Sequence, residues 1–439
     1  MKRDRLSISR YPVYKDSGVE WMGEVPKHWA IKRVKEFAII ANGSTPKSSV
    51  PENWEGNYAW VTTDDLGKLE TKFIKNSKRT ITEIGFKSCG TTLCPEGSIV
   101  LSCRAPIGHI GILSIQACTN QGCKTLIVNQ RTKRTISSMF IFYSVLSSKE
   151  KLQALGRGTT FIELSTKELS LFNLALPPLS EQIAIADYLD TKTAQIDRKI
   201  DLLTQKAEQY GNLKQSLINE TVTRGFDQSV PMKDSEGEWF DCVPSDWNEK
   251  RVKDLFRLIT DVAPDNNDYE LLSVYASIGV RPRKDLEQRG NKASTTDGYW
   301  IVKKGDIVVN KLLAWMGSIG LSNYEGVTSP AYDVLRKLNN DIEERFYGYL
   351  FRTGKAQEIF KKSSRGIMDM RLRLYFDKLG AITVPVPPIA EQKSIADYLD
   401  TKTAQIERFI QSINTQIEKL KELRKTLIND VVTGKIKVV

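Results

Sequence analysis

The sequence has very few histidines and no long hydrophobic run. Only His28 and His109 occur among its 439 residues, which leaves little room for imidazole-based catalysis or for zinc sites built on histidine. No apolar stretch approaches the ~20 residues that a transmembrane helix needs. The basic start, MKRDRLSISR, has no apolar segment after it and does not fit a signal peptide. We therefore expect a cytoplasmic protein that does not span a membrane.

Sequence motifs of common catalytic sites are also missing. There is no GxxxxGK[ST] loop for ATP, no GxGxxG turn for a dinucleotide and no GxSxG nucleophile turn. The Asn/Asp-Pro-Pro-aromatic tetrapeptide of amino-methylating enzymes does not occur, because Leu176 and Val386 precede the two Pro-Pro pairs. The carboxylates form no metal-nuclease pattern. We expect no catalytic residue, no bound cofactor and no metal site in this chain.

The cysteines are few and clustered. Five of the six lie within 35 residues, and Cys89/Cys94 and Cys118/Cys123 each have four residues between them. Zinc sites tolerate that spacing, but no CxxC occurs and no nearby histidine completes a ligand set. We interpret these cysteines as reduced thiols packed in a cytoplasmic protein.

The charge balance is basic and the chain is long. Lys and Arg number 64 against 53 Asp and Glu, giving a net charge of +11. Such an excess favours a polyanionic partner. The length is too great for one ordinary domain and predicts several compact units.

An internal duplication gives the chain its plan. Residues of the segment 15–35 recur 218 positions later, in 233–253, with Trp29 matched by Trp247. A second block recurs 210 positions later and contains the identical run IADYLDTKTAQI, at 185–196 and 395–406. Twelve identical residues in succession do not arise by chance. The chain is therefore predicted to alternate globular and helical segments.

The expected fold class is α+β, with two β-rich domains separated by two long helices. The globular domains are placed at 1–178 and 226–388, and the helical spacers at 179–225 and 389–439. Strands are expected at Ser98–Ser102, Ile110–Ile115, Tyr299–Val302 and Ile307–Asn310, where short apolar runs end at Gly or Pro turns.

Both helical segments carry apolar residues at heptad spacing. Asp190 and Asp400 are predicted as helix N-caps, and Gly225 and Gly434 as helix stops. Each seam is short, so neither helix is expected to be stable alone. We therefore predict that the two helices pair as an antiparallel coiled coil about a pseudo-twofold axis. The alternative is that each helix packs only on its own domain. The seam residues are Ile196, Ile200, Leu203, Tyr210 and Leu217 in the first copy, and Ile406, Ile410, Ile413, Ile417, Leu420 and Leu427 in the second.

Basic and hydroxyl side chains in Gly-rich surroundings are the candidate DNA contacts. Such loops present backbone N–H groups, hydroxyls and guanidinium groups that can bind phosphates and base edges. The alternative for each residue is a solvated surface charge. The candidates are Ser44, Thr45, Lys47, Arg104, Lys124 and Arg157 in the first domain, and Arg281, Arg283, Lys311, Arg365, Arg371 and Arg373 in the second.

These motifs together resemble the DNA specificity subunit of Type I restriction–modification systems. The resemblance covers nearly the whole chain, and its motifs are jointly specific. They are YPVYKDSGVEWMGEVPKHW (11–29), GSTP (43–46), WVTTDDL (60–66), RAPIG (104–108), NQGCK (120–124), LPPLSEQ (176–182), KKGDIVVNKLLAWMGSIG (303–320), EGVTSPAY (325–332) and VPPIAEQ (386–392).

The resemblance implies two target-recognition domains, each reading half of a bipartite DNA sequence. The helices would space the halves and dock two methyltransferase (modification) subunits, and restriction/translocase subunits would join that core. S-adenosylmethionine, ATP and Mg would be bound by the partners. The rise from Ile196 to Leu217, ~32 Å, agrees with recognition units one duplex turn, ~34–36 Å, apart.

Two other classes of function remain open at this stage. A stand-alone DNA-modifying or DNA-cleaving enzyme with a degenerate site is disfavoured by the missing motifs. A coiled-coil protein-interaction scaffold is disfavoured by the basic charge and by the two dissimilar Gly/Arg-rich globular segments.

Overall fold

The chain folds into two compact units of mixed helix and strand. The computed structural model describes residues 9–129, 131–132, 134–158, 162–227, 229–235, 237, 239, 241–276, 278–285, 296–367 and 371–438. The first unit comprises residues 1–202 and 416–439, and the second comprises 203–415. The division runs through two long helices, each of which contributes to both units. The predicted α+β fold class is confirmed.

The first unit contains a five-stranded sheet, a three-stranded sheet and two strand pairs. The five-stranded sheet has the order β4 (Ala38–Asn42), β11 (Cys123–Val128), β8 (Ile99–Ser102), β9 (Ile110–Leu113) and β6 (Phe73–Ile74). The smaller sheet has the order β10 (Ala117–Thr119), β5 (Trp54–Val61) and β7 (Arg79–Ile81). The pairs are β1 (Tyr14–Asp16) with β2 (Glu24–Pro26), and β3 (Ala30–Arg33) with β12 (Asn173–Leu176).

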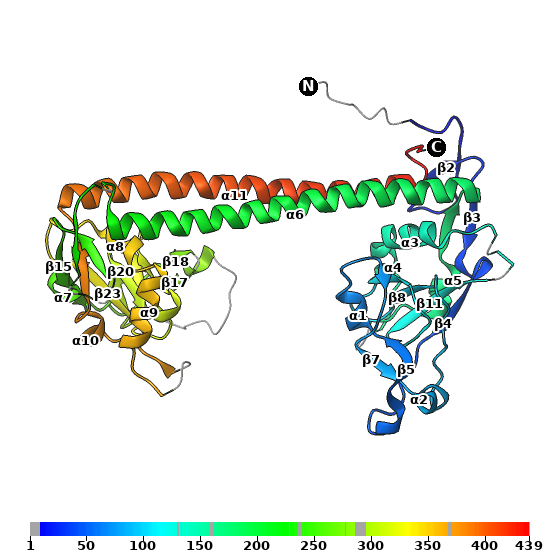
Figure 1. The fold of residues 1–439 in the computed structure, drawn as a ribbon, viewed down its shortest axis with the longest axis horizontal. Helices are drawn as coiled ribbons and strands as arrows, with labels where there is room; N and C mark the ends of the chain where they lie inside the picture. The colour runs from blue at the N-terminus through cyan, green and yellow to red at the C-terminus, as the bar shows by residue number, and fades with distance from the viewer. Residues whose placement is uncertain are drawn as a thin grey trace. The chain divides into compact units, whose positions relative to one another are not determined.

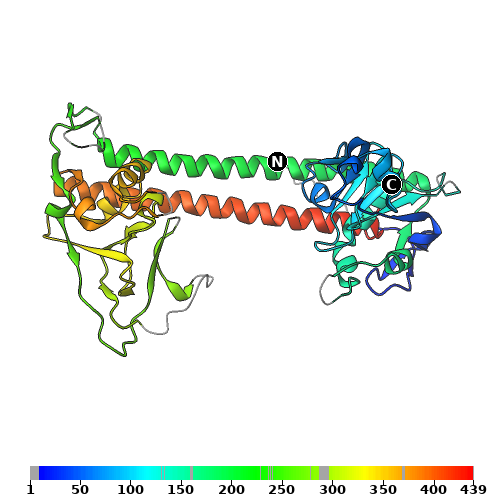
Figure 2. The same ribbon diagram turned by 90° about the horizontal axis from the view of Figure 1, so that it is seen from below.

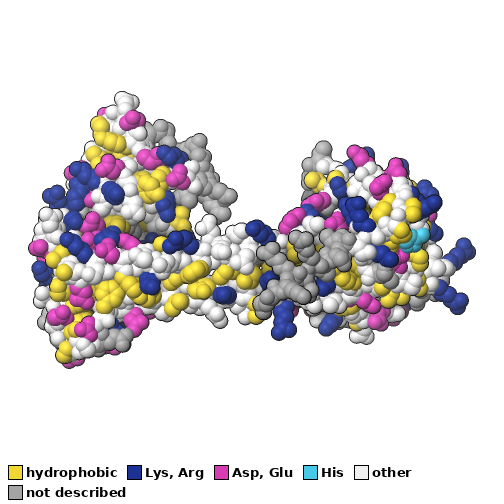
Figure 3. All heavy atoms as spheres, turned by 90° about the horizontal axis from the view of Figure 1, so that it is seen from above, with side chains coloured by type: hydrophobic (Ala, Val, Ile, Leu, Met, Phe, Trp, Pro, Cys, Tyr) yellow, Lys and Arg dark blue, Asp and Glu magenta, His cyan; other side chains and the backbone are white. Residues whose placement is uncertain are grey.

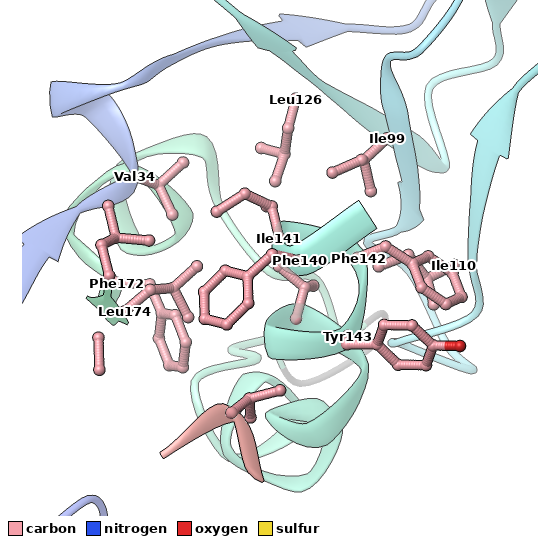
Figure 4. Packing of buried hydrophobic residues seen from close by; sticks show 14 of the residues in the cluster. Val34, Ile99, Ile110, Leu126, Phe140, Ile141, Phe142, Tyr143, Phe172 and Leu174 are labelled. Carbon is pink, nitrogen blue, oxygen red and sulfur yellow. The ribbon is translucent and has the colours of Figure 1, made fainter. Parts of the chain in front are cut away.

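The core of the first unit lies around the helix α3 (Ser138–Ser147). Its residues Phe140 and Ile141 are fully buried, and strand residues such as Ile99 and Leu126 belong to the same cluster. Figure 4 shows this packing. Smaller helices complete the unit: α1 (Thr63–Gly67), α2 (Glu83–Lys87), α4 (Lys149–Ala154), α5 (Thr166–Leu171) and the 3-10 turns η1 (Val34–Glu36) and η2 (Pro51–Asn53). The predicted strands at 98–102 and 110–115 are confirmed as β8 and β9.

The second unit repeats part of this plan with a four-stranded sheet. Its order is β16 (Phe256–Ile259), β23 (Tyr332–Lys337), β20 (Ile307–Asn310) and β21 (Ile319–Leu321). The strand pairs are β13 (Met232–Asp234) with β14 (Cys242–Pro244), β15 (Asn248–Arg251) with β24 (Thr383–Val386), β17 (Leu272–Tyr275) with β18 (Gly279–Pro282), and β19 (Trp300–Val302) with β22 (Gly326–Thr328). The predicted strands at 299–302 and 307–310 are confirmed as β19 and β20.

Several short helices pack around this second sheet. Phe346 and Tyr347 on α8 are buried, as Phe140 and Ile141 are on α3. The elements are α7 (Val252–Leu255), α8 (Glu344–Leu350), α9 (Gly354–Ser363), α10 (Phe376–Leu379) and the turns η3 (Arg283–Asp285) and η4 (Ala314–Met316).

Two long helices, α6 (Leu179–Arg224) and α11 (Ile389–Val432), begin directly after the Pro-Pro pairs. The prediction that Asp190 and Asp400 are N-caps is wrong, since both lie well inside these helices. Their carboxylates instead accept hydrogen bonds from Tyr143 on α3 (2.5 Å) and Tyr349 on α8 (2.7 Å). The predicted stops are confirmed, because Gly225 and Gly434 follow the helix ends with φ of 67° and 74°.

Within each unit the two helices lie side by side and run antiparallel (Figures 1 and 2). In the first unit Asp197 of α6 pairs with Arg424 of α11 at 2.9 Å, and Ile185 shares a core with Val431. In the second unit Glu407 pairs with Lys214. Glu407 and Lys214 are related to Asp197 and Arg424 by the 210-residue repeat, so the duplicated sequence makes the same cross-helix contact in both units.

The predicted seam faces inward along both helices. Every seam residue is buried or half-buried, and none is exposed. Tyr210 also stacks on Phe409 within the second unit, with ring centroids 5.7 Å apart. Hydrophobic residues at heptad spacing thus provide the apolar face that each helix needs for packing.

The copied Glu-Gln pairs attach each globular domain to the start of its long helix. Glu181 accepts a hydrogen bond from the buried Trp29 indole (3.2 Å), and Glu391 accepts one from Trp247 (3.0 Å). Gln182 donates to the carbonyl of Pro177 and accepts from the N–H of Ser137, the N-cap of α3. Gln392 repeats these roles with the carbonyl of Pro387 and the N–H of Glu343. The repeated motif is therefore a structural joint.

The cysteines are free thiols, and Cys94, Cys103, Cys118 and Cys123 are buried. Burial raises the pKa of the Cys118 thiol to about 12, which keeps it protonated at neutral pH. Among the described residues no group of three or more His, Cys, Asp or Glu side chains is placed to hold a metal ion. In the same part of the chain, no helix combines the length and apolar character that a bilayer crossing requires.

Candidate nucleic-acid interface

The loop 43–47 of the first unit is held against the three-stranded sheet by its backbone. The carbonyl of Ser44 accepts from the Trp60 indole (3.0 Å), and that of Lys47 accepts from the Trp54 indole (3.3 Å). Thr45 donates its hydroxyl hydrogen bond to Gln121. The side chain of Lys47 remains exposed. The structure thus presents a basic side chain on a loop that two buried tryptophans anchor.

Glu163 engages two of the predicted DNA contacts. Its carboxylate accepts from Arg104 Nε at 3.0 Å and lies 3.6 Å from Lys124 Nζ. The Lys124 side chain is only 6% exposed and also donates to Asn42 (3.2 Å). Lys124 stays a predicted DNA contact, but a phosphate could reach its ammonium only after these internal contacts broke. Arg104 is half-exposed.

Arg157 is a predicted cation of the first unit whose side chain is largely exposed. Its side chain is 82% exposed, and its only ion pair within the described residues is a long one, 3.6 Å, to Glu168. Its backbone pairs with that of Glu163. An extended guanidinium of this kind is free to bind a phosphate.

Three of the predicted arginines in the second unit lie on one hairpin. Arg365 and Arg373 pair through both backbone hydrogen bonds, at 2.9 Å, and Arg371 is also exposed. Asp377 lies 3.0 Å from Arg365 Nη2 but neutralises only one of the three charges. The sequence predicted these residues separately, and the structure brings them together as a basic hairpin.

Lys311 is largely committed to an internal partner. Its ammonium lies 3.3 Å from the carboxylate of Asp333, whose side chain is 10% exposed. Burial raises the pKa of Asp333 and the nearby ammonium opposes that rise. Lys311 is therefore a poor candidate for DNA contact, for the same reason as Lys124.

Arg281 and Arg283 lie on β18 and the turn that follows. Arg283 is half-buried, whereas Arg281 is exposed and donates to the Tyr324 hydroxyl at 2.5 Å. Arg281 lines a groove of about 850 Å³ in the second unit. Lys214 of α6 and Arg352, which lies between α8 and α9, also line this groove. The pKa of Arg352 is lowered by burial.

One exposed arginine in the first unit, Arg79, is not among the contacts predicted from the sequence. Arg79 on β7 has its guanidinium carbon 3.5 Å from the ring centroid of Trp54 and 5.6 Å from that of Trp60. The surrounding sequence, KNSKRT (75–80), contains no glycine and so lacks the pattern on which the other candidates were predicted. Only the pairing of β7 with β5 brings it to the tryptophans.

The fold and these surfaces define a duplicated α+β protein with a different basic surface on each unit. The chain belongs to the family described as the Type I restriction modification DNA specificity domain, which it matches over residues 26–209 and 244–419. The match covers about four-fifths of the sequence. The family resemblance drawn from the motifs is confirmed.

Curated relatives support the same family. The chain is 30% identical over 243 residues to the Type I restriction enzyme MjaIX specificity subunit of Methanocaldococcus jannaschii, a match that spans 54% of each chain. It is 24% identical over 437 residues to the MjaVIII specificity subunit of that organism, covering 94% of each. The specificity subunit of Escherichia coli EcoKI is 20% identical over 445 residues.

Solved structures share the fold across nearly the whole chain. One comes from a study of complex assembly and conformational transition of the type I R-M system, with a TM-score of 0.68, 15% identity, and coverage of 93% of this chain and 98% of the other. The HsdS subunit from Thermoanaerobacter tengcongensis gives a TM-score of 0.55 at 16% identity, covering 94% and 98%. Family membership assigns this chain a role in DNA sequence specificity.

Proposed function

We propose that each unit reads one half of a bipartite double-stranded DNA target. The observation that carries this proposal is the contrast between the copied joints and the different surfaces. Both units repeat the Trp–Glu and Tyr–Asp contacts, while the first presents loop 43–47 and the second presents the hairpin of Arg365, Arg371 and Arg373. A shared framework with different exposed cations suits two readers of different half-sites.

The long helices, in this proposal, set the number of unread base pairs and dock two methyltransferase subunits. Figure 3 shows hydrophobic side chains along the exposed face of the helices. Leu213 and Leu423 occupy the same slot in the two copies and are 53% and 54% exposed. Two equivalent apolar positions support two equivalent docking sites, because a partner that covers an exposed leucine removes apolar surface from water and so stabilises the complex.

The chemistry belongs to the partner subunits in this proposal. Adenine methylation from S-adenosylmethionine would occur on the methyltransferases, and ATP- and Mg-dependent translocation and cleavage on the restriction subunits. The chain itself would act as a non-catalytic DNA-binding subunit in the cytoplasm. Its contribution to the reaction is to select the DNA and to place the adenines within reach of the methyltransferases.

Co-expression with the cognate methyltransferase subunit tests the proposal through methylome sequencing. We expect adenine methylation at a split motif with a fixed spacer. Exchange of residues 20–176 for the corresponding domain of another family member should change one half-site and leave the other unchanged. A single contiguous motif would contradict bipartite reading, and a change in both halves would contradict independent reading by the two units.

A further inference from the structure

Arg79 of the first unit is exposed, yet its guanidinium is held in place by aromatic rings. Its guanidinium carbon lies 3.5 Å from the ring centroid of Trp54, a distance at which the planar group rests on the ring face. Trp54 and Trp60 pack edge to face, with centroids 5.1 Å apart and an interplanar angle of 80°. Both tryptophans are buried. The platform under Arg79 is therefore rigid.

The backbone at Arg79 is fixed as well. The carbonyl of Arg79 accepts a hydrogen bond from Ser77 Oγ at 2.6 Å, and that hydroxyl oxygen accepts one from the backbone N–H of Trp60 at 3.0 Å. Arg79 stands opposite Trp60 in the register of β5 and β7. Because β7 is an edge strand of its sheet, these contacts leave one side of the residue open to solvent.

The charge of Arg79 is not satisfied inside the protein. Within the described residues its guanidinium has no ion pair and no hydrogen-bond acceptor, whereas Arg104 has Glu163 and Arg365 has Asp377. A stacked guanidinium keeps its N–H groups in the plane of the group, where they can donate outward. Most of the entropy cost of ordering a long side chain has already been met in the free protein.

The anchored loop 43–47 shares this platform. Trp54 and Trp60, which hold Arg79, also donate to the carbonyls of Lys47 and Ser44. The exposed side chain of Lys47 and the guanidinium of Arg79 are thus attached to the same two rings. In Figure 1, β5 and β7 lie at the end of the first domain farthest from α6.

From this geometry we infer that Arg79 reads a guanine in the half-site that the first unit recognises. A planar guanidinium donates two parallel hydrogen bonds to O6 and N7 of guanine in the major groove, and no other base offers that pair of acceptors. Lys47 would bind the neighbouring phosphate as a point charge and orient the edge strand. The inference rests on the proposed function, since it names the base-reading residue of one unit.

The second unit contains a related arrangement. Arg281 on β18 lies with its guanidinium carbon 5.8 Å from the ring centroid of Tyr324 and donates to that hydroxyl. It is exposed and has no carboxylate partner within the part of the chain that the structure describes. Substitution of Arg281 is therefore a matched comparison for substitution of Arg79, because it changes a similar arginine in the other unit.

The test compares methylation by complexes that carry Arg79→Lys, Arg79→Ala or Arg281→Lys, each expressed with the methyltransferase subunit. The Arg79 variants should lose discrimination at one G·C pair of one half-site, by about 5- to 150-fold, with the rest of the motif unchanged. Arg281→Lys should leave that position intact. Lys78→Ala is the control, because it removes a neighbouring exposed cation that has no ring platform.

The outcomes separate base reading from a phosphate contact. A uniform loss of affinity with an unchanged motif, together with a smaller salt dependence of binding by the purified complex, would show that Arg79 binds phosphate and overturn the inference. A motif unchanged in sequence and affinity would also overturn it. If the complex with Arg79→Ala fails to assemble, Arg79→Lys, which retains the charge, still tests whether discrimination at the G·C pair depends on the guanidinium. A wild-type motif that is not bipartite would instead contradict the proposed function.

Discussion

Replacement of Tyr143 by phenylalanine should weaken the attachment of the first domain to α6. Tyr143 is 3% exposed, and its hydroxyl donates to Asp190 at 2.5 Å and lies 3.4 Å from Thr193 Oγ1. The substitution removes the hydroxyl and leaves the ring in place. Asp190 keeps a second partner, Lys72, at 2.5 Å, so its charge is not left unpaired.

The size of the effect follows from the charge and exposure of the acceptor. Hydrogen bonds to charged groups contribute roughly 1.5–3 kcal/mol. Because the Asp190 side chain is 35% exposed, water replaces part of the lost bond, and we expect a loss of about 1.5 kcal/mol in the free energy of unfolding of the first unit. That corresponds to a fall of roughly 3–6 °C in Tm for a unit of this size.

Urea unfolding followed by tryptophan fluorescence measures this loss. A double-mutant cycle with Asp190→Asn should give a coupling energy of about 1 kcal/mol between the two side chains. In the second unit the Tyr349 hydroxyl donates to Asp400 at 2.7 Å, so Tyr349→Phe should have a similar effect there. Tyr375→Phe is the control, because that side chain is 43% exposed and its change should cost less than about 0.5 kcal/mol. A coupling energy near zero would refute the reasoning that these tyrosines hold the domains to the helices.

Two further predictions concern the helices and their joints. Insertion of four residues within 205–209 of α6 should lengthen that helix by ~6 Å, about two base pairs; methylome sequencing should then show a longer spacer between unchanged half-sites, and an unchanged spacer would contradict the ruler. Burial raises the pKa of Glu391, and the Trp247 hydrogen bond only partly opposes this. The folded state therefore favours the protonated carboxyl, so its contribution to stability is present at low pH and is lost as pH rises through the raised pKa. In urea unfolding at pH 7, Glu391→Gln should be at least as stable as the wild type. The wild type should become more stable toward pH 5, and the variant should not show that increase. Glu181→Gln is the contrast: Glu181 also accepts from Tyr11 and His28, so its substitution should destabilise the first unit.

The repeat and the heptad spacing predicted the framework of this protein well. Four expected strands and both helix stops lie where the local sequence placed them, because Gly and Pro turns and apolar runs act over a few residues. The N-cap prediction for Asp190 failed because the sequence identifies a capping residue only by its amino-acid type. A carboxylate in mid-helix that binds a tyrosine from another element has the same sequence signature as a cap.

The sequence could not show which candidate cations are accessible to DNA, as Lys124 and Arg79 illustrate. Both are basic residues on strands, and composition treats them alike. Lys124 is buried beside Glu163 and Asn42, which lie 39 and 82 positions away in the chain. Arg79 is exposed on Trp54 and Trp60, which the register of two paired strands places beneath it.

The sequence by itself determined that the chain is duplicated, that long helices connect two β-rich units, and that its family reads DNA. These properties depend on local periodicity and on motifs that are contiguous in the chain. The tertiary structure alone decided which cations face solvent and which are neutralised internally. That choice depends on contacts between residues far apart in sequence, where a carboxylate or an aromatic ring a few Å away decides whether a charge is available to DNA.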